Sequence, residues 1–211
     1  IQSDDTVAVW GCGPVGLFAI QSALAMGASK VIAIDHYPNR LALAKQLGAE
    51  IIDFRETDVR EALMEMSGGI GVDAVIDAVG MESHGFAIDN MIDVVKQKVG
   101  IGADRASALK QAIMAVRFGG KVSIPGVYGG MTDKWPLGAM MEKGLQIRGG
   151  QTHVQKYTHD LLEKIEDGTL DTTFMISHRL PLEKAPEGYK NFKENQNEWT
   201  KVVLKPGMEN A

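Results

Sequence analysis

The chain contains 211 residues, of which 45% are hydrophobic and 23% charged, a composition typical of a globular protein with one domain or slightly more. Its 27 acidic and 22 basic side chains give a formal net charge of -5, which argues against nucleic acid as a partner. A single cysteine excludes an internal disulfide framework, and no apolar run reaches the roughly 18 to 20 residues of a membrane helix. We therefore expect a cytoplasmic protein, and a chain that begins at Ile1 is expected to be part of a longer one.

Short β-favouring runs alternate with longer helical stretches over residues 1–151, which is the pattern of a parallel sheet with crossover helices. The expected strands are bounded by turn residues and cover 6–10, 31–34, 51–54, 72–76, 121–124 and 145–148. The expected helices start or stop at glycine or proline, or repeat apolar residues at helical spacing, and cover 14–26, 40–47, 59–66 and 106–118. The sequence therefore predicts an α/β fold with a doubly wound, parallel, six-stranded sheet.

Two segments depart from this alternation. Residues 81–105 exceed an ordinary strand-to-helix connection and are interpreted as an insertion, a surface excursion more readily than a flap beside a ligand. Residues 152–211 contain an expected helix at 157–167, a loop-rich stretch and a closing apolar run at 202–204. Because this segment is too short to bury its own core, we expect it to complete a domain whose main body lies elsewhere in the parent protein.

The most informative motif is G-x-G-x-x-G, formed by Gly11, Gly13 and Gly16 between the first strand and a helix that opens at Pro14. In this context the first glycine permits a tight turn and the second lets the backbone approach a pyrophosphate. The third lets the helix pack closely on the strand. The helix N-terminus then faces the anion. The motif predicts a Rossmann fold that binds a dinucleotide.

Asp35 ends the second expected strand, 19 residues after Gly16. A carboxylate about 20 residues beyond the glycines holds the adenosine ribose hydroxyls and repels a 2′-phosphate. The sequence therefore predicts NAD rather than NADP. Arg40 keeps NADP open as an alternative cofactor, because a cation beside this site could accommodate the 2′-phosphate in part.

A methyltransferase is the remote alternative, since that class also places a glycine-rich turn after its first strand and an acid after its second. Methyltransferases usually carry an acidic residue just before the glycines, whereas Trp10 occupies that position here. Six regular strand signals also suit a dinucleotide-binding fold better.

Four segments resemble, in order along the chain, the coenzyme-binding half of zinc-dependent medium-chain alcohol dehydrogenases. They are residues 5–16, 73–80, 118–122 and 178–187. The insertion and the segment Lys143-Gly144-Leu145-Gln146-Ile147-Arg148-Gly149-Gly150-Gln151 look most like the glutathione-independent formaldehyde dehydrogenase branch. The resemblance covers essentially the whole chain.

The resemblance implies an NAD-dependent oxidoreductase that moves a hydride between an alcohol or aldehyde hydrate and the nicotinamide. It assigns residues 1–151 to the Rossmann domain and residues 152–211 to an incomplete GroES-like catalytic domain. It also implies a homo-oligomer, a dimer or tetramer. The implied cofactor-binding residues are Gly11, Gly13, Pro14, Val15, Gly16, Asp35, Arg40, Ala78, Val79, Pro125, Gly126, Val127 and Lys201.

In the family a catalytic zinc polarises the alcohol oxygen, and the resemblance places its ligands in a segment that precedes the coenzyme domain. We therefore expect no catalytic or metal-binding residue in this chain, and cofactor binding without turnover. Cys12 is interpreted as a small side chain beneath the pyrophosphate. Of the five histidines, His36 and His84 are candidates for contacts at the cofactor edge. The others, at positions 153, 159 and 178, are interpreted as structural or surface residues.

Two further functions remain open within the same fold. One is a polyol or threonine dehydrogenase of the same superfamily. The other is a zinc-free quinone reductase or a non-enzymatic dinucleotide-binding protein. Each would keep the glycine loop, so the loop alone does not separate them.

Overall fold

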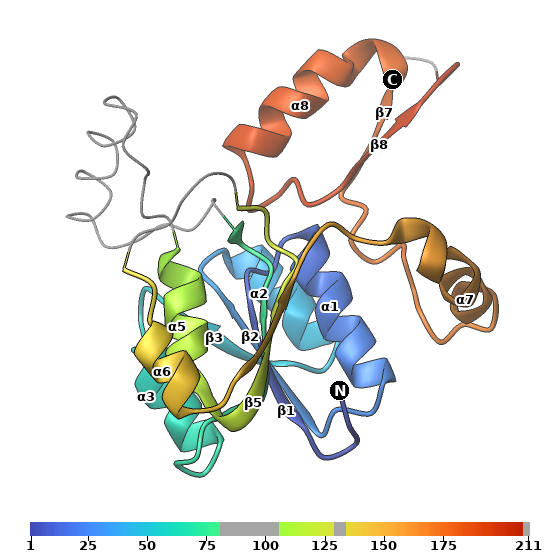
Figure 1. Cartoon of the computed structure of the whole chain (residues 1–211). Helices are drawn as coiled ribbons and strands as arrows, with labels where there is room; N and C mark the ends of the chain where they lie inside the picture. The colour runs from blue at the N-terminus through green and yellow to red at the C-terminus, as the bar shows by residue number, and fades with distance from the viewer. Residues whose placement is uncertain (81–105, 129–133, 209–211) are drawn as a thin grey trace.

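The computed structural model describes residues 1–80, 106–128 and 134–208, so the expected insertion at 81–105 and His84 lie outside the described residues. Six parallel strands form one sheet in the order β3-β2-β1-β4-β5-β6 (Figure 1). Their bounds are β1 Thr6–Trp10, β2 Lys30–Asp35, β3 Glu50–Asp53, β4 Val72–Asp77, β5 Val116–Ile124 and β6 Gln146–Gly149. The predicted doubly wound α/β fold is confirmed, and the order reverses between β1 and β4, where such sheets bind ligands.

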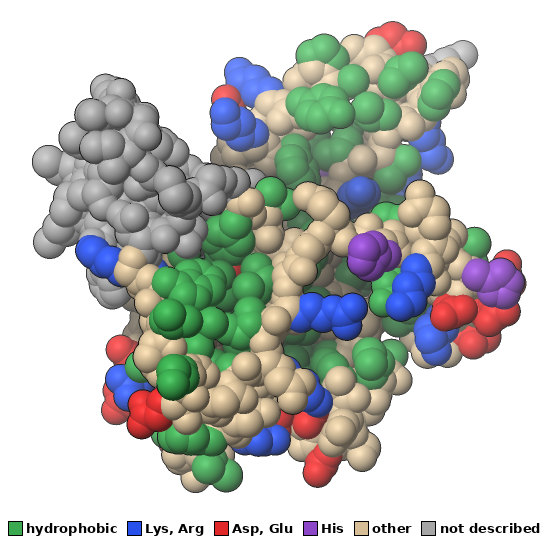
Figure 2. Space-filling model, in the orientation of Figure 1, with side chains coloured by type: hydrophobic (Ala, Val, Ile, Leu, Met, Phe, Trp, Pro, Cys, Tyr) green, Lys and Arg blue, Asp and Glu red, His purple; other side chains and the backbone are tan. Residues whose placement is uncertain are grey.

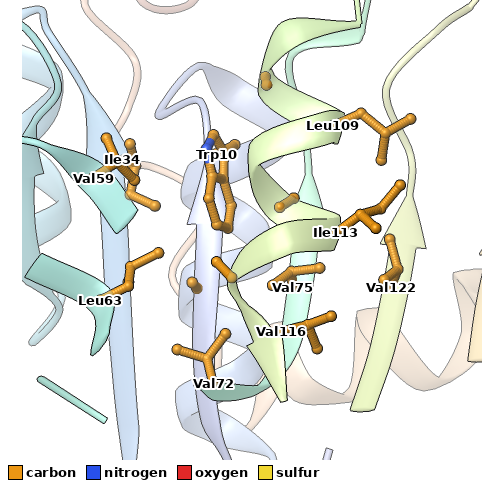
Figure 3. Close-up of a cluster of buried hydrophobic side chains, with 14 of the residues drawn as sticks. Trp10, Ile34, Val59, Leu63, Val72, Val75, Leu109, Ile113, Val116 and Val122 are labelled. Atoms are coloured by element: carbon orange, nitrogen blue, oxygen red, sulfur yellow. The ribbon is translucent and has the colours of Figure 1, made fainter. Parts of the chain in front are cut away.

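Helices cover both faces of this sheet. Along β1 the side chains alternate, so that Val7 and Val9 pack under one pair of helices while Ala8 and Trp10 pack under the other. The first pair is α1 (Pro14–Ala25) with α2 (Pro38–Gln46), and the second is α3 (Val59–Met66) with α5 (Ser107–Ala115). Trp10 lies between the α3 and α5 side chains in the second core (Figure 3). Both faces are therefore buried over the central strands β1, β2 and β4, whereas Lys121, Ser123 and Arg148 on one face of β5 and β6 are exposed.

The junction between α5 and β5 differs from the sequence-based expectation. The helix expected over residues 106–118 ends at Ala115, and the strand begins at Val116. Val116 pairs with Val72, but the next pair joins Lys121 to Ala74, so the intervening residues bulge out of β5. Gly119, at φ +68°, belongs to this bulge and does not end the helix. The sequence reading was wrong here because a bulged strand and a helix terminus both use glycine.

The ammonium group of Lys143 stabilises the same junction from the loop before β6. Its Nζ donates to the carbonyl oxygens of Met114 at 2.7 Å and Val116 at 2.8 Å. These carbonyls lie where α5 ends, so a cation there also opposes the negative end of the helix dipole. Burial and the charge of Arg60 lower the pKa of Lys143, which means that this interaction holds an ammonium in a partly desolvated position.

The C-terminal part is more regular than expected. It contains α7 (Val154–Glu166), a parallel pair of β7 (His178–Pro181) with β8 (Val202–Lys205), a 3-10 turn (Leu182–Lys184) and α8 (Ala185–Glu194). The loop-rich interpretation was wrong because Pro186 lies in the first turn of α8, where a missing N–H costs no helical hydrogen bond. A short helix α6 (Leu137–Glu142) was also missed.

The C-terminal part packs against the helices of the sheet through a few specific residues. Phe174 meets Phe18 of α1 edge-to-face, with ring centroids 5.8 Å apart, and Met175 is buried in the core beneath α1 and α2. The C-terminal part also has exposed apolar side chains, among them Leu182, Tyr189 and Phe192. Apolar side chains are visible on this part in Figure 2. That exposed apolar surface suits a segment that completes a larger domain, which stays a prediction. Among the described helices, none is long and apolar enough to span a membrane.

A polar contact joins β1, β4 and β5 near their N-terminal ends. Asp73 of β4 accepts from the backbone amide of Thr6 at 2.8 Å and from Nε of Arg117 at 2.5 Å. Burial alone would raise the pKa of Asp73, but these hydrogen bonds and the Arg117 charge outweigh it and hold the pKa below its ordinary 3.8. The carboxylate therefore stabilises the fold in its charged form.

We predict that Asp73→Asn lowers the free energy of unfolding at neutral pH by about 1–2 kcal/mol, because charge-assisted hydrogen bonds are lost. A depressed pKa contributes stability above the ordinary carboxyl pKa and loses it as pH falls through the folded value. The difference from the unsubstituted chain should therefore shrink as the pH falls through the lowered pKa of Asp73. Urea unfolding of both chains at neutral pH and at a series of acidic pH values measures the difference in the free energy of unfolding. Asp160→Asn on exposed α7 is the matched control, and a difference that persists in acid would contradict the assignment.

Candidate functional site

The glycine loop between β1 and α1 lies at the carboxyl edge of the sheet. Gly11 has φ +86°, which favours glycine, and its amide donates to the carbonyl oxygen of Ile34 at 2.8 Å. A Cβ on Gly16 would lie 1.7 Å from the Gly11 carbonyl oxygen, so α1 approaches β1 as closely as backbone allows. These two glycines are required by the fold itself.

Gly13 differs from its two neighbours in the motif. A Cβ placed on it would meet only Nη1 of Arg40, at 3.9 Å, within a 4 Å radius. Gly13 is also the residue that precedes α1, and it makes no side-chain cap, with Pro14 in the first turn and no acidic residue there. The positive end of the helix dipole is therefore open to an anion at the glycine whose missing side chain leaves space. This geometry fits a pyrophosphate.

Asp35 connects the second strand to the glycine loop. The residue is 4% exposed, and its Oδ2 accepts from the Cys12 amide at 2.7 Å. Its Oδ1 accepts from the amides of His36 at 2.6 Å and Tyr37 at 3.1 Å. Each carboxylate oxygen has more than one lone-pair direction, so the group can still accept from a ribose hydroxyl. The structure thus adds a role that the sequence did not predict, which is to hold the loop.

Arg40 lies beside Asp35 and reaches the C-terminal part of the chain. Its Nη1 is 3.9 Å from Asp35 Oδ2, and its guanidinium lies over the Tyr37 ring, 4.6 Å from the centroid. Its Nε donates to the Gln196 carbonyl oxygen at 3.1 Å and its Nη2 donates to Gln196 Oε1 at 3.2 Å. The cation that left NADP open is therefore already engaged by protein groups.

A second wall of the site follows β4 and β5. The Ala78 amide donates to the Trp10 carbonyl oxygen at 2.9 Å, which places the end of β4 beside the glycine loop. The Gly126 amide donates to the Asp77 carbonyl oxygen at 2.9 Å, which joins the loop after β5 to the end of β4. A Cβ on Gly80 would lie 2.5 Å from backbone atoms of Val127, so the two loops touch. The predicted residues at 78–79 and 125–127 are thus brought together.

Asp77 and Tyr128 hold this second wall, and sequence reasoning missed both. Asp77 is fully buried; its Oδ1 accepts from the amides of Val79 at 3.0 Å and Gly80 at 3.3 Å. Its Oδ2 accepts from the Tyr128 hydroxyl at 2.5 Å. Burial and the Asp77 carboxylate raise the pKa of Tyr128, so the phenol stays protonated and donates. An acid at the end of a central parallel strand was the signal available in the sequence.

Two apolar side chains are exposed on the loops of this edge. Val15 is 54% exposed at the start of α1, and Val127 is 69% exposed after β5. Solvated valines next to a glycine loop suit contact with a flat, largely apolar ring. Lys201 lies before β8, where its carbonyl oxygen accepts from the amides of Ser177 and His178, and its own side chain is exposed. Its contact with a cofactor stays a prediction.

The remaining candidates are Cys12 and the described histidines, and a contact of His36 with the cofactor stays a prediction. Cys12 is fully buried, and burial, with the Asp35 charge adding to it, raises the pKa of its thiol, so a reactive thiolate is disfavoured. His36 packs beside the Tyr37 and Phe54 rings, with centroids 4.0 and 4.8 Å away, next to Asp35. His153 precedes α7, and His159 lies on the exposed surface of that helix. His178 stacks on Trp199.

A zinc site does not emerge from these residues. In the described parts of the chain, no three His, Cys, Asp or Glu side chains group closely enough to hold a metal ion. Structural and catalytic zinc sites need three or four such ligands converging on the ion.

Comparison with known proteins agrees with the geometry. Residues 14–101 match a family model described as zinc-binding dehydrogenase. An uncharacterized zinc-type alcohol dehydrogenase-like protein of Bacillus subtilis is 40% identical, over 98% of this chain and 54% of its own length. A glutathione-independent formaldehyde dehydrogenase of Pseudomonas aeruginosa is 31% identical, over 89% of this chain and 48% of its length.

The fold is shared with solved alcohol dehydrogenases. The alcohol dehydrogenase of Thermus sp. ATN1 superposes with a TM-score of 0.81 at 35% identity, over 97% of this chain and 52% of that protein. The chain thus spans about half the length of the relatives it matches. Sequence motif, sheet order and relatives agree, and the chain belongs to the zinc-dependent medium-chain alcohol dehydrogenase family.

Proposed function

We propose that this chain binds NAD(H) at the carboxyl edge of its parallel sheet. The observation that carries the proposal is the pairing of two neighbouring features. Gly13 leaves open space at the N-terminus of α1, and the buried Asp35 carboxylate holds the same loop from the adjacent strand. Anion-binding backbone and a carboxylate at this spacing are what a dinucleotide requires.

Different residues would contact different parts of the cofactor. The first turn of α1 would bind the pyrophosphate, and Asp35 would accept from the adenosine ribose hydroxyls. Val15, Val79 and Val127 would pack on the nicotinamide, while the backbone of residues 125–127 would bond its carboxamide. When bound, the nicotinamide supplies the hydride acceptor or donor of the reaction. The protein's own contribution is to orient that ring and exclude water from one side of it.

NAD is favoured over NADP for two electrostatic reasons. A 2′-phosphate on the adenosine ribose would approach the negative charge of Asp35. Arg40, the cation that could offset this repulsion, already donates to Gln196 and lies close to Asp35. Asp35 therefore repels the phosphorylated cofactor, and Arg40 has fewer free donors with which to offset that repulsion.

For the full-length protein we propose an NAD-dependent, zinc-assisted oxidoreductase that interconverts an alcohol or aldehyde hydrate with its oxidised product. The names of the Bacillus subtilis and Pseudomonas aeruginosa relatives support an alcohol or formaldehyde as substrate. Because the relatives are about twice as long, this chain is assigned cofactor binding, and turnover and zinc are assigned to the whole protein. A homo-oligomeric, cytoplasmic enzyme belongs to the same proposal.

Titration of NADH and then NADPH into the chain tests the cofactor proposal, with nucleotide fluorescence and tryptophan quenching as readouts. We expect saturable NADH binding at least about tenfold tighter than NADPH binding. Placing like charges together costs several kcal/mol, and about 1.4 kcal/mol is a factor of ten in affinity. Equal affinities would contradict the role of Asp35, and saturable binding of neither nucleotide would contradict the proposed function.

Two glycine substitutions separate cofactor binding from folding. Gly16→Ala should lower the free energy of unfolding by about 3 kcal/mol or more, because its Cβ overlaps the Gly11 carbonyl. Gly13→Ala should change that free energy by no more than about 1 kcal/mol, since its φ is an ordinary -70°. Yet the added methyl fills the proposed pyrophosphate position, so NADH affinity should fall about tenfold or more.

Thermal unfolding and NADH titration on the two variants provide the comparison. A Gly13→Ala chain that keeps both its stability and its NADH affinity would show that the open space at this glycine is not where the pyrophosphate binds.

A further inference from the structure

A turn in the C-terminal part reaches across to the proposed cofactor site. The Glu198 and Trp199 amides both donate to the Asn195 carbonyl oxygen at 3.0 Å, which closes the turn after α8. From this turn, Asn197 Oδ1 accepts from the Asn39 amide at 3.0 Å, at the start of α2. The neighbouring Gln196 contacts Arg40 through both its backbone and its side chain. The turn is thus fixed on the helix that follows Asp35.

The contact between Gln196 and Arg40 uses one particular edge of the guanidinium. Nε donates to the Gln196 carbonyl oxygen and Nη2 donates to Gln196 Oε1, at 3.1 and 3.2 Å. These two donors point in parallel and form an edge with which arginine grips a carboxylate or phosphate in bidentate fashion. Gln196 therefore occupies an edge that a 2′-phosphate would need.

The other surroundings of Arg40 keep it in this orientation. Its guanidinium covers the Tyr37 ring, and its Nη1 faces both Asp35 and the space at Gly13. Only 13% of the side chain is exposed, so it has little freedom to turn toward a new ligand. The Nε and Nη2 donors of Arg40 are thus engaged by Gln196, and its Nη1 faces Asp35.

We propose that Gln196 is a specificity-determining residue, which excludes NADP(H) by holding the bidentate edge of Arg40. The inference rests on the proposed function, namely that the chain binds NAD(H). It assigns part of the cofactor choice to the C-terminal part, outside the glycine loop and Asp35. Gln196 acts through Arg40 and is a positioning residue, not a catalytic one.

The test is the ratio of NADPH to NADH dissociation constants in variants of the full 211-residue chain. Gln196→Ala frees Nη2 but leaves the backbone carbonyl to hold Nε, so we expect NADPH to bind about fivefold more tightly. NADH affinity should stay within about twofold, because Asp35 is untouched. Gln155→Ala on exposed α7 is the matched control and should leave the ratio unchanged.

Two further variants separate positioning of Arg40 from a general effect on the fold. Gln196→Glu keeps an oxygen acceptor at the same position, so it should restore or increase the discrimination against NADPH. In an Arg40→Ala background, Gln196→Ala should no longer change the ratio, because the group it acts through is gone. Thermal unfolding of each variant accompanies the titrations.

The outcomes distinguish this inference from the proposed function. If the unsubstituted chain binds NADH but Gln196→Ala leaves the ratio unchanged, the role of Gln196 is overturned while cofactor binding stands. The inference is also overturned if Gln196→Ala changes the ratio equally with and without Arg40. If the unsubstituted chain binds neither nucleotide, both the proposed function and the inference fail.

Discussion

The buried carboxylate of Asp35 is the interaction on which the arrangement of the site depends. A charge that is 4% exposed is stable only when hydrogen-bond donors and a counter-charge replace water. Here the backbone amides of Cys12, His36 and Tyr37 provide the donors, and Arg40 lies 3.9 Å away. The same contacts fix the glycine loop against the end of β2. Loop geometry and local negative charge therefore have a single physical origin.

A second buried aspartate performs the corresponding task on the other side of the sheet reversal. Asp77 ends β4 and accepts from backbone amides that follow it, just as Asp35 does at the end of β2. The hydroxyl of Tyr128 adds a donor from the loop after β5. Because both carboxylates accept from amides of the loops that follow their strands, the loops at the carboxyl edge are held in place before any ligand binds.

The sheet and the glycine loop could be predicted because their signals are local. Apolar runs, the glycine spacing and an acid at the end of the second strand each report a short stretch of backbone. The parts that sequence reasoning missed depend on residues far apart in the chain. The bulge in β5 exists because Val116 and Lys121 must both pair with β4, and Tyr128 meets Asp77 only after the two loops fold together. No periodicity in either segment encodes those contacts.

Arg40 shows most clearly what a motif leaves undetermined. From the sequence, an arginine near the ribose acid could either help to hold a phosphate or do nothing to it, since its partner was unknown. In the structure Gln196, 156 residues away in sequence, accepts from Nε and Nη2 of Arg40, the two donors that a phosphate would need. Charge near a binding site therefore says little about selectivity until the hydrogen-bond donors of that charge are assigned to partners. In this chain the hydrogen bonds of Arg40 join the C-terminal part to the helix that follows Asp35, so the proposed cofactor choice depends on contacts between distant parts of the chain as well as on the motif.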